Sequence, residues 1–222
     1  SLKRSVEALF CADTAAAWPE EPDALVFSTV LHEAAHNLGP SHEYRVDGKT
    51  DSEVFGGPIA SMMEELKAQT AAMYLVKWLA ERDLVHDPGR HHMADLVWAT
   101  GHIARGMEDG AGRPLPYSRL AAIQLGWLRD ADAAVWHPDQ TAANGEDLGC
   151  LAIDTAGVAQ AIDGLAEEVF RIKAQGDKAA AEALVAKYVT DDGRHAELRS
   201  VITERLSREP MSSYVYRIDV GE

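Results

Sequence analysis

One short segment, His32-Glu33-Ala34-Ala35-His36, restricts the structure of this chain more than any other feature of its sequence. Helical residues four positions apart lie on one face, so the ring nitrogens of His32 and His36 can bind one metal ion. The stretch from about 25 to 38 contains neither glycine nor proline, and Asn37-Leu38-Gly39-Pro40 then forms a helix stop signal. We therefore expect a helix over about Leu25 to Leu38 that carries two metal ligands close to its end.

The residue that follows the first histidine has a different role. Glu33 is rotated by about 100° from His32 around the helix, which places its carboxylate beside a bound metal ion. Zinc lowers the pKa of a bound water, and a neighbouring carboxylate can take the proton that the water loses. The pattern predicts Glu33 as the general base of a zinc-dependent hydrolase. The alternative is an ordinary amphipathic helix with two surface histidines, because so short a motif also arises by chance.

A catalytic zinc needs a third protein ligand and an open fourth position. A second helical pattern runs from Ser61 to about Arg82, and one apolar stripe follows it. Its members are Met62, Leu66, Met73, Val76 and Leu79. Glu65 falls inside this stripe, whereas Glu64 points roughly the other way. A buried ionised carboxylate is costly unless it is paired or bound to a metal, so we expect Glu65 to be the third ligand.

These two segments resemble the metal motifs of the dipeptidyl peptidase III family of zinc metallopeptidases and its bacterial and plant relatives. His32 to Pro40 resembles the family's His-Glu helix with its Gly-Pro-like turn, and Glu64 to Gln69 resembles its Glu-Glu-x-x-Ala-acid motif. The resemblance implies Zn²⁺ held by the two histidines and Glu65, with a peptide as substrate. It also implies that Glu64 accepts a hydrogen bond that orients one ligand histidine.

The sequence departs from the family pattern at two points. The dipeptidyl peptidases have one more residue between the two histidines, so this chain is more similar to the divergent relatives that carry HExxH. Gln69 stands where the second motif has its last acid; its amide oxygen can still accept a hydrogen bond but adds no negative charge.

The peptidases also use a downstream histidine to stabilise the oxyanion, and His92 and His102 are the nearest candidates here. We expect Tyr117 to be a packing residue, although its phenol could donate to the same oxyanion.

In the family, the substrate lies between two lobes, and the lobe that precedes the zinc helix contributes binding residues. His32 stands close to the start of this chain, which begins without methionine. We therefore expect residues 1–222 to form a single helical zinc-hydrolase domain that is the C-terminal catalytic part of a longer protein, with the N-terminal lobe missing from this chain.

The sequence predicts a mainly α, helical zincin-like metallohydrolase domain with a short terminal β segment. Beyond the two motif helices, periodicity favours helices at about His92 to Glu108, Tyr117 to Ala134, Thr155 to Ala174, Asp177 to Tyr188 and Arg194 to Ser207, with a strand at Ser213 to Asp219. The resemblance adds a helix over Gly101 to Gly112 and a helical hairpin over Gly176 to Tyr188.

Composition excludes several kinds of partner. The net charge of −15 argues against nucleic acid and against anionic membrane surfaces. No apolar run reaches the roughly 18 residues that a membrane span needs. We expect Cys11 and Cys150 to be buried thiols, although they could pair in an oxidising compartment. The sequence does not determine the compartment; we expect a cytoplasmic location by default, and a periplasmic or secreted one if the missing N-terminus carries a signal peptide.

The sequence therefore predicts a zinc-dependent hydrolase, in particular a metallopeptidase. Two other classes of function stay open: a zinc-binding module without catalysis, and a helical partner-binding domain without metal.

Overall fold

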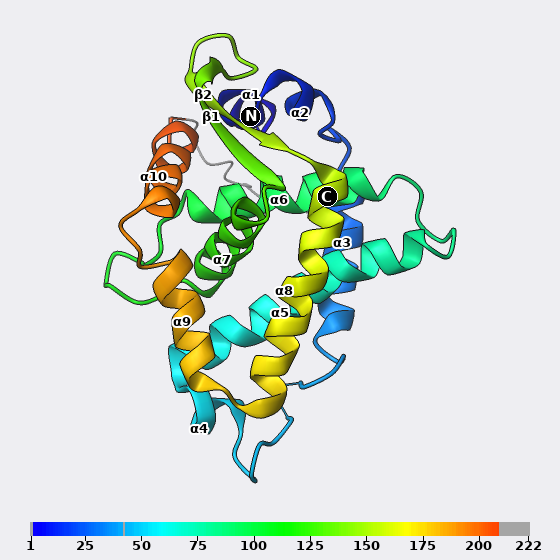
Figure 1. Cartoon of the computed structure of the whole chain (residues 1–222), viewed down its shortest axis with the longest axis vertical. Coiled ribbons are helices and arrows are strands. Elements are labelled where there is room, and N and C mark those ends of the chain that lie inside the picture. The colour runs from blue at the N-terminus through cyan, green and yellow to red at the C-terminus, as the bar shows by residue number, and fades with distance from the viewer. Residues whose placement is uncertain (1, 42, 209–222) are drawn as a thin grey trace, which may run out of the picture.

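The computed structural model describes residues 2–41 and 43–208. Within these ranges the chain is mainly α-helical, as expected, with one two-stranded antiparallel sheet (Figure 1). The elements are α1 (Leu2–Leu9), α2 (Ala12–Ala16), α3 (Asp23–Ala35), α4 (Asp51–Phe55), α5 (Gly57–Ala80), α6 (Pro88–Ile103), α7 (Pro116–Asp130), β1 (Ala134–Thr141), β2 (Leu148–Ile153), α8 (Thr155–Gln175), α9 (Lys178–Tyr188) and α10 (Arg194–Leu206).

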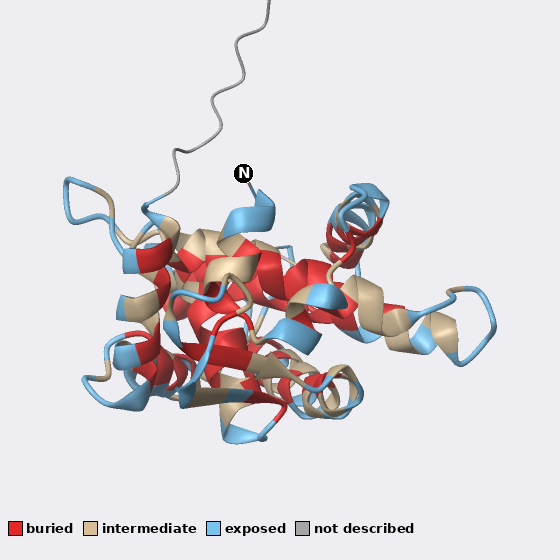
Figure 2. Ribbon diagram, turned by 90° about the horizontal axis from the view of Figure 1, so that it is seen from above, coloured by how far each residue is buried: buried red, intermediate tan, exposed pale blue. Residues whose placement is uncertain are grey.

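The long helix α5 runs through the centre of the fold and packs against α3, α7 and α8. All side chains from Met62 to Met73 are buried or half-buried, and the core that they join is seen as the red interior in Figure 2. The apolar residues of the predicted stripe are buried or half-buried, as expected, but between Met62 and Met73 the other faces of the helix are covered as well. As a result, polar side chains on any face of this part of α5 must find partners within the protein.

Small side chains bring the end of α3 close to α5. Ala35, Ala68 and Ala71 form a cluster against Phe170 of α8. The turn after α3 contains Gly39 at φ +61°, where an added Cβ would lie 2.5 Å from a ring carbon of Phe170. This turn therefore requires glycine both for its backbone conformation and for the close approach of α8.

The helices expected from periodicity are present, but several limits differ. Helix α3 ends at Ala35, three residues earlier than expected. Helix α6 ends at Ile103, so the prediction of a helix over Gly101 to Gly112, which came from the resemblance, is wrong. The chain instead turns at Gly106, whose φ is +83°. The short helices α1, α2 and α4 were not expected, because each is too short for a clear periodicity.

The hairpin β1–β2 is a second correction, because the sequence predicted a helix that continued to Ala134. Helix α7 ends at Asp130, and β1 pairs with β2 from Ala134 onward. Pro138 obscured this strand, since proline cannot donate to a β-ladder. The register shifts between His137 and Thr141, which accommodates the proline.

Cys11 and Cys150 form a disulfide, so the expectation of two free thiols is wrong. The bond joins the residue that directly precedes α2 to β2, and the Cys11 amide also donates to the carbonyl oxygen of Leu151 at 3.1 Å. The two cysteines are 139 positions apart in sequence, which is why their pairing was not apparent before the fold was known.

Two further expectations concern the membrane and the C-terminus. None of the described helices combines the length and apolar character that crossing a bilayer requires. The strand expected at Ser213 to Asp219 lies outside the described residues.

Candidate metal centre

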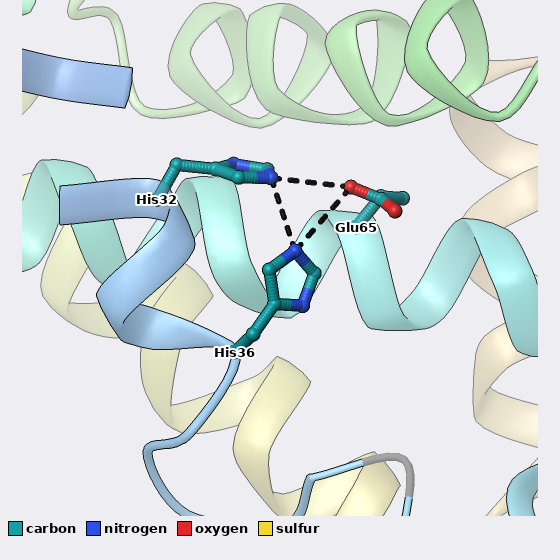
Figure 3. A group of neighbouring side chains, drawn as sticks. All are labelled: His32, His36 and Glu65. Atoms are coloured by element: carbon teal, nitrogen blue, oxygen red, sulfur yellow. Dashed lines mark hydrogen bonds and ion pairs between the residues drawn. The ribbon is translucent and has the colours of Figure 1, made fainter. Parts of the chain in front are cut away.

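Three side chains from two helices converge at one point (Figure 3). Nε2 of His32 lies 3.2 Å from Nε2 of His36 and 3.2 Å from Oε2 of Glu65, and His36 Nε2 lies 3.8 Å from the same carboxylate oxygen. His32 lies in the last turn of α3, His36 directly follows the end of that helix, and Glu65 lies in the third turn of α5. The structure thus brings together the three residues that the sequence predicted as ligands.

The opposite ring nitrogen of each histidine has its own partner. Nδ1 of His32 lies 2.8 Å from Oε1 of Gln69, and Nδ1 of His36 lies 2.8 Å from Oε1 of Glu64. Both partner atoms are acceptors, so each imidazole donates from Nδ1. In these tautomers, each neutral imidazole presents the lone pair of Nε2 to the other ligand atoms.

The donor set fits a divalent metal such as zinc. Two imidazole lone pairs and one carboxylate oxygen face each other, and three acceptors at such short range require a cation or an additional proton between them. A tetrahedral zinc with bonds of about 2.0–2.1 Å separates its ligand atoms by about 3.3 Å. The distances of 3.2 to 3.8 Å in this cluster match that requirement.

The electrostatics of the cluster favour positive charge next to Glu65. Burial alone would lower the pKa of His32, but its hydrogen bonds with Glu65 and Gln69 outweigh burial and raise that pKa. Burial alone would raise the pKa of Glu65, but its hydrogen bonds with His32 and Tyr117 outweigh burial and lower it. The site therefore stabilises a carboxylate beside a cationic group.

Glu64 is more enclosed than the sequence predicted. Its side chain is 13% exposed, compared with 21% for Glu65, so the expectation that Glu64 points away from the buried face is wrong. Glu64 pairs with the buried ammonium groups of Lys173 and Lys67, and Lys173 also pairs with Asp51 at 2.6 Å. Burial alone would raise the pKa of Glu64, but Lys173 and His36 outweigh burial and lower it.

Lys67 also holds the end of the histidine helix. Its ammonium donates to the carbonyl oxygens of Ala35, His36 and Leu38 at 3.1, 2.9 and 3.3 Å. These carbonyls belong to the last residue of α3 and to the turn that follows it, where the helix leaves carbonyl groups without internal partners. A buried side chain of α5 therefore fixes the backbone that carries His36.

A pocket of about 210 Å³ opens beside the cluster. It is lined by Leu25, Ser28, Thr29, His32, Glu33, Gln69, Trp98, His102 and Tyr117. Glu33 is solvent-exposed there, so its carboxylate is accessible to a molecule in the pocket. Tyr117 also lines the pocket, which corrects the expectation that this residue serves packing alone.

Two pocket residues have strongly shifted pKa values. Burial lowers the pKa of His102 to about 4, so its imidazole, which packs 4.3 Å from the Trp98 ring, is neutral at pH 7. Burial and the interaction with Glu65 raise the pKa of Tyr117 to about 12, so its phenol keeps its proton. Both groups therefore present hydrogen-bond donors at neutral pH.

His92 does not share this environment, and its prediction as an oxyanion-stabilising residue is wrong. Its side chain is buried in the core, and Nε2 lies 3.2 Å from the carbonyl oxygen of Met73. Burial lowers its pKa. His92 is thus a core residue of α6, and His102, three turns later, is the histidine of this helix that lines the pocket.

The fold has close counterparts among solved structures. Dipeptidyl peptidase III from Caldithrix abyssi superposes over 94% of this chain with a TM-score of 0.76 and 21% sequence identity. Dipeptidyl peptidase III from Corallococcus sp. strain EGB superposes over 93% with a TM-score of 0.70 and 21% identity. This chain has a dipeptidyl peptidase III-like fold. The resemblance found in the sequence is therefore confirmed in three dimensions.

The dipeptidyl peptidase III-like fold covers only part of each relative. The chain spans 36% of the Caldithrix protein and 34% of the Corallococcus protein. Among curated proteins, Nudix hydrolase 3 of Arabidopsis thaliana is 28% identical over 175 residues, which are 77% of this chain and 21% of that protein. No protein-family model matches the chain.

Within this dipeptidyl peptidase III-like fold, several residues that support the ligands were not predicted. Lys67, Lys173 and Asp95 are charged side chains that are buried next to Glu64 or Gln69. Lys67 had a detectable signal, because it lies among the apolar residues of a long helical pattern. Lys173 and Asp95 come from α8 and α6, and the sequence does not indicate that these helices meet α5 at the metal motif.

Proposed function

We propose that this chain is the catalytic part of a zinc-dependent metallopeptidase. The observation that carries the proposal is a set of three metal-binding atoms within 3.8 Å of one another, next to a pocket that also exposes the Glu33 carboxylate. The dipeptidyl peptidase III-like fold supports a peptide as substrate. His32, His36 and Glu65 would hold zinc, which supplies the positive charge that polarises a carbonyl and lowers the pKa of water.

In this mechanism, Glu33 transfers the proton. Its carboxylate takes a proton from the attacking water and later delivers that proton to the nitrogen of the leaving amine. The exposed position of Glu33 at the pocket, next in sequence to His32, supports this role. The same residue thereby serves first as general base and then as general acid.

Tyr117 and His102 are the proposed donors to the developing oxyanion. Both line the pocket, and their ring centroids are 5.4 Å apart. The raised pKa of Tyr117 and the lowered pKa of His102 leave a protonated phenol and a neutral imidazole at pH 7; the phenol, which donates to Glu65 in this structure, would redirect its O–H to the oxyanion. Such donors lower the energy of a tetrahedral oxyanion more than that of the planar carbonyl.

We further propose that residues 1–222 form one helical domain that acts together with other parts of a longer protein. The support is coverage, since the chain corresponds to about a third of either dipeptidyl peptidase III. The disulfide between Cys11 and Cys150 favours a periplasmic or secreted location, because such bonds persist in oxidising compartments.

A peptide-library digest of the purified chain, with and without a chelator, tests the proposal together with zinc analysis. We expect one zinc per chain and cleavage that stops when the chelator is added. Glu33→Gln should retain zinc and lose cleavage, because the amide cannot take a proton, whereas His36→Ala should lose both. Zinc without cleavage would support a non-catalytic zinc module, and absence of zinc would support a metal-free partner-binding domain.

A further inference from the structure

Asp95 lies behind the metal-binding cluster and reaches it through one intervening residue. Oδ1 of Asp95 accepts a hydrogen bond from Nε2 of Gln69 at 3.1 Å, and the hydroxyl of Ser28 donates to the same oxygen. Oε1 of Gln69 in turn lies 2.8 Å from Nδ1 of His32. A chain of hydrogen bonds therefore runs from α6 through α5 to a ligand histidine on α3.

The orientation of the Gln69 amide decides which nitrogen of His32 is protonated. With Oε1 toward the ring, Nδ1 donates and Nε2 presents a lone pair to the metal position. With the amide reversed, its NH₂ group would face Nδ1, so Nδ1 would have to accept and the proton would move to Nε2. A protonated Nε2 cannot bind a metal ion.

Asp95 provides the acceptor that prevents this reversal. Gln69 is 4% exposed and Asp95 is 3% exposed, so water does not replace the hydrogen bond between them. Oδ1 accepts from two donors, whereas Oδ2 has no hydrogen-bond partner in the described part of the chain. Burial raises the pKa of Asp95 to about 7. A proton on this carboxyl is best placed on Oδ2, which leaves Oδ1 as acceptor in both protonation states.

We infer that Asp95 is a positioning residue that fixes the Gln69 amide and thereby holds His32 in the Nδ1–H tautomer that a metal ligand needs. This inference rests on the proposed metal site, because His32 is one of its three ligands. It does not depend on hydrolysis. The partners of ligand histidines typically contribute about 10- to 100-fold to metal affinity.

The test compares Asp95→Leu with Asp95→Asn in the full chain. Leucine removes the acceptor with the same branching of the side chain, so we expect zinc affinity, measured by competition with a chromophoric chelator, to fall at least about tenfold. Asparagine keeps a carbonyl oxygen for Gln69, so its zinc affinity should stay within about threefold of the wild type. Similar losses in both variants, or no loss in Asp95→Leu, would overturn the inference.

A double variant separates positioning from general damage to the fold. In Asp95→Leu with Gln69→Glu, the new carboxylate has two acceptor oxygens and accepts from Nδ1 of His32 whichever way it lies. We expect this double variant to recover zinc affinity to within about threefold of the wild type. A double variant as weak as Asp95→Leu alone would contradict the positioning role.

The tautomer of His32 in the metal-free protein provides a readout that requires neither zinc nor activity. Nitrogen-15 NMR of the imidazole should show a protonated Nδ1 in the wild type, whether or not Nε2 also carries the additional proton of the metal-free cluster, and a loss of the Nδ1 proton in Asp95→Leu. If Asp95→Leu does not fold, the wild-type spectrum alone decides. A wild type whose Nδ1 carries no proton would overturn the inference, even if the chain proves to be a peptidase.

Discussion

The ammonium group of Lys67 donates a hydrogen bond to the carbonyl oxygen of His36 at 2.9 Å, so a residue of α5 holds the backbone of a ligand that directly follows α3. The same ammonium lies 3.1 Å from Oε1 of Glu64, which accepts from the ring of His36. Lys67 thus contacts both the main chain of His36 and the side chain that orients its imidazole. The geometry of this ligand depends on a charged group that is itself fully buried.

Lys67→Met should destabilise the fold. The substitution leaves the carbonyl oxygens at the end of α3 without a donor and weakens the pairing of Glu64, for an expected loss of about 2–4 kcal/mol in the free energy of unfolding. Lys77→Met on the same helix is the matched control, because the pair of Lys77 with Asp163 is partly exposed and its loss should cost no more than about 1 kcal/mol. Urea unfolding measures the free energy of unfolding of both variants, and equal losses in the two would contradict the role assigned to Lys67.

Asp95 should make stability depend on pH. Burial raises the folded-state pKa from 3.8 to about 7, so the folded state retains a proton that the unfolded state loses at lower pH. The stability from this group is present below about pH 4 and is lost as pH rises toward about 7, by at most about 4 kcal/mol.

Asp95→Asn isolates this effect, because asparagine stays neutral. Urea unfolding of both metal-free proteins should show the stability of the wild type falling relative to the variant between about pH 4.5 and about pH 8. If the free energy of unfolding of the wild type, relative to that of Asp95→Asn, stays constant or rises over this pH range, Asp95 does not have a raised pKa.

The disulfide between Cys11 and Cys150 should contribute strongly to stability. Because it closes a loop of 139 positions, the chain-entropy account predicts a loss of up to about 5 kcal/mol in a variant with both cysteines replaced by alanine. Thermal unfolding with and without reductant measures the contribution of the disulfide. Reductant should lower the melting temperature of the wild type and leave that of the variant unchanged. A wild type whose melting temperature does not change on complete reduction would contradict the prediction.

The ligand histidines and Glu65 were predictable because the evidence for them is local. Helical spacing places His32 and His36 on one face, and the helical pattern around Glu65 marks a carboxylate that needs a partner. The longer helices also followed from periodicity, apart from their ends, whereas the short helices α1, α2 and α4 did not. These features need only the geometry of a single helix and the cost of burying charge.

The rest depends on contacts between segments far apart in sequence. Lys173 meets Glu64, and Asp95 meets Gln69, only because α8 and α6 pack against α5. The hairpin was missed because Pro138 interrupts the strand pattern, although a register shift accommodates it. No local property of the sequence indicates such tertiary contacts.

The central claim is that His32, His36 and Glu65 bind one zinc ion and leave room for a further ligand. Anomalous diffraction at the zinc edge from zinc-soaked crystals tests it most directly. We predict one strong peak at about 2.0–2.2 Å from Nε2 of His32, Nε2 of His36 and a carboxylate oxygen of Glu65, with no fourth protein ligand. No peak among these atoms, or a zinc ion closed off by a fourth side chain, would contradict the account.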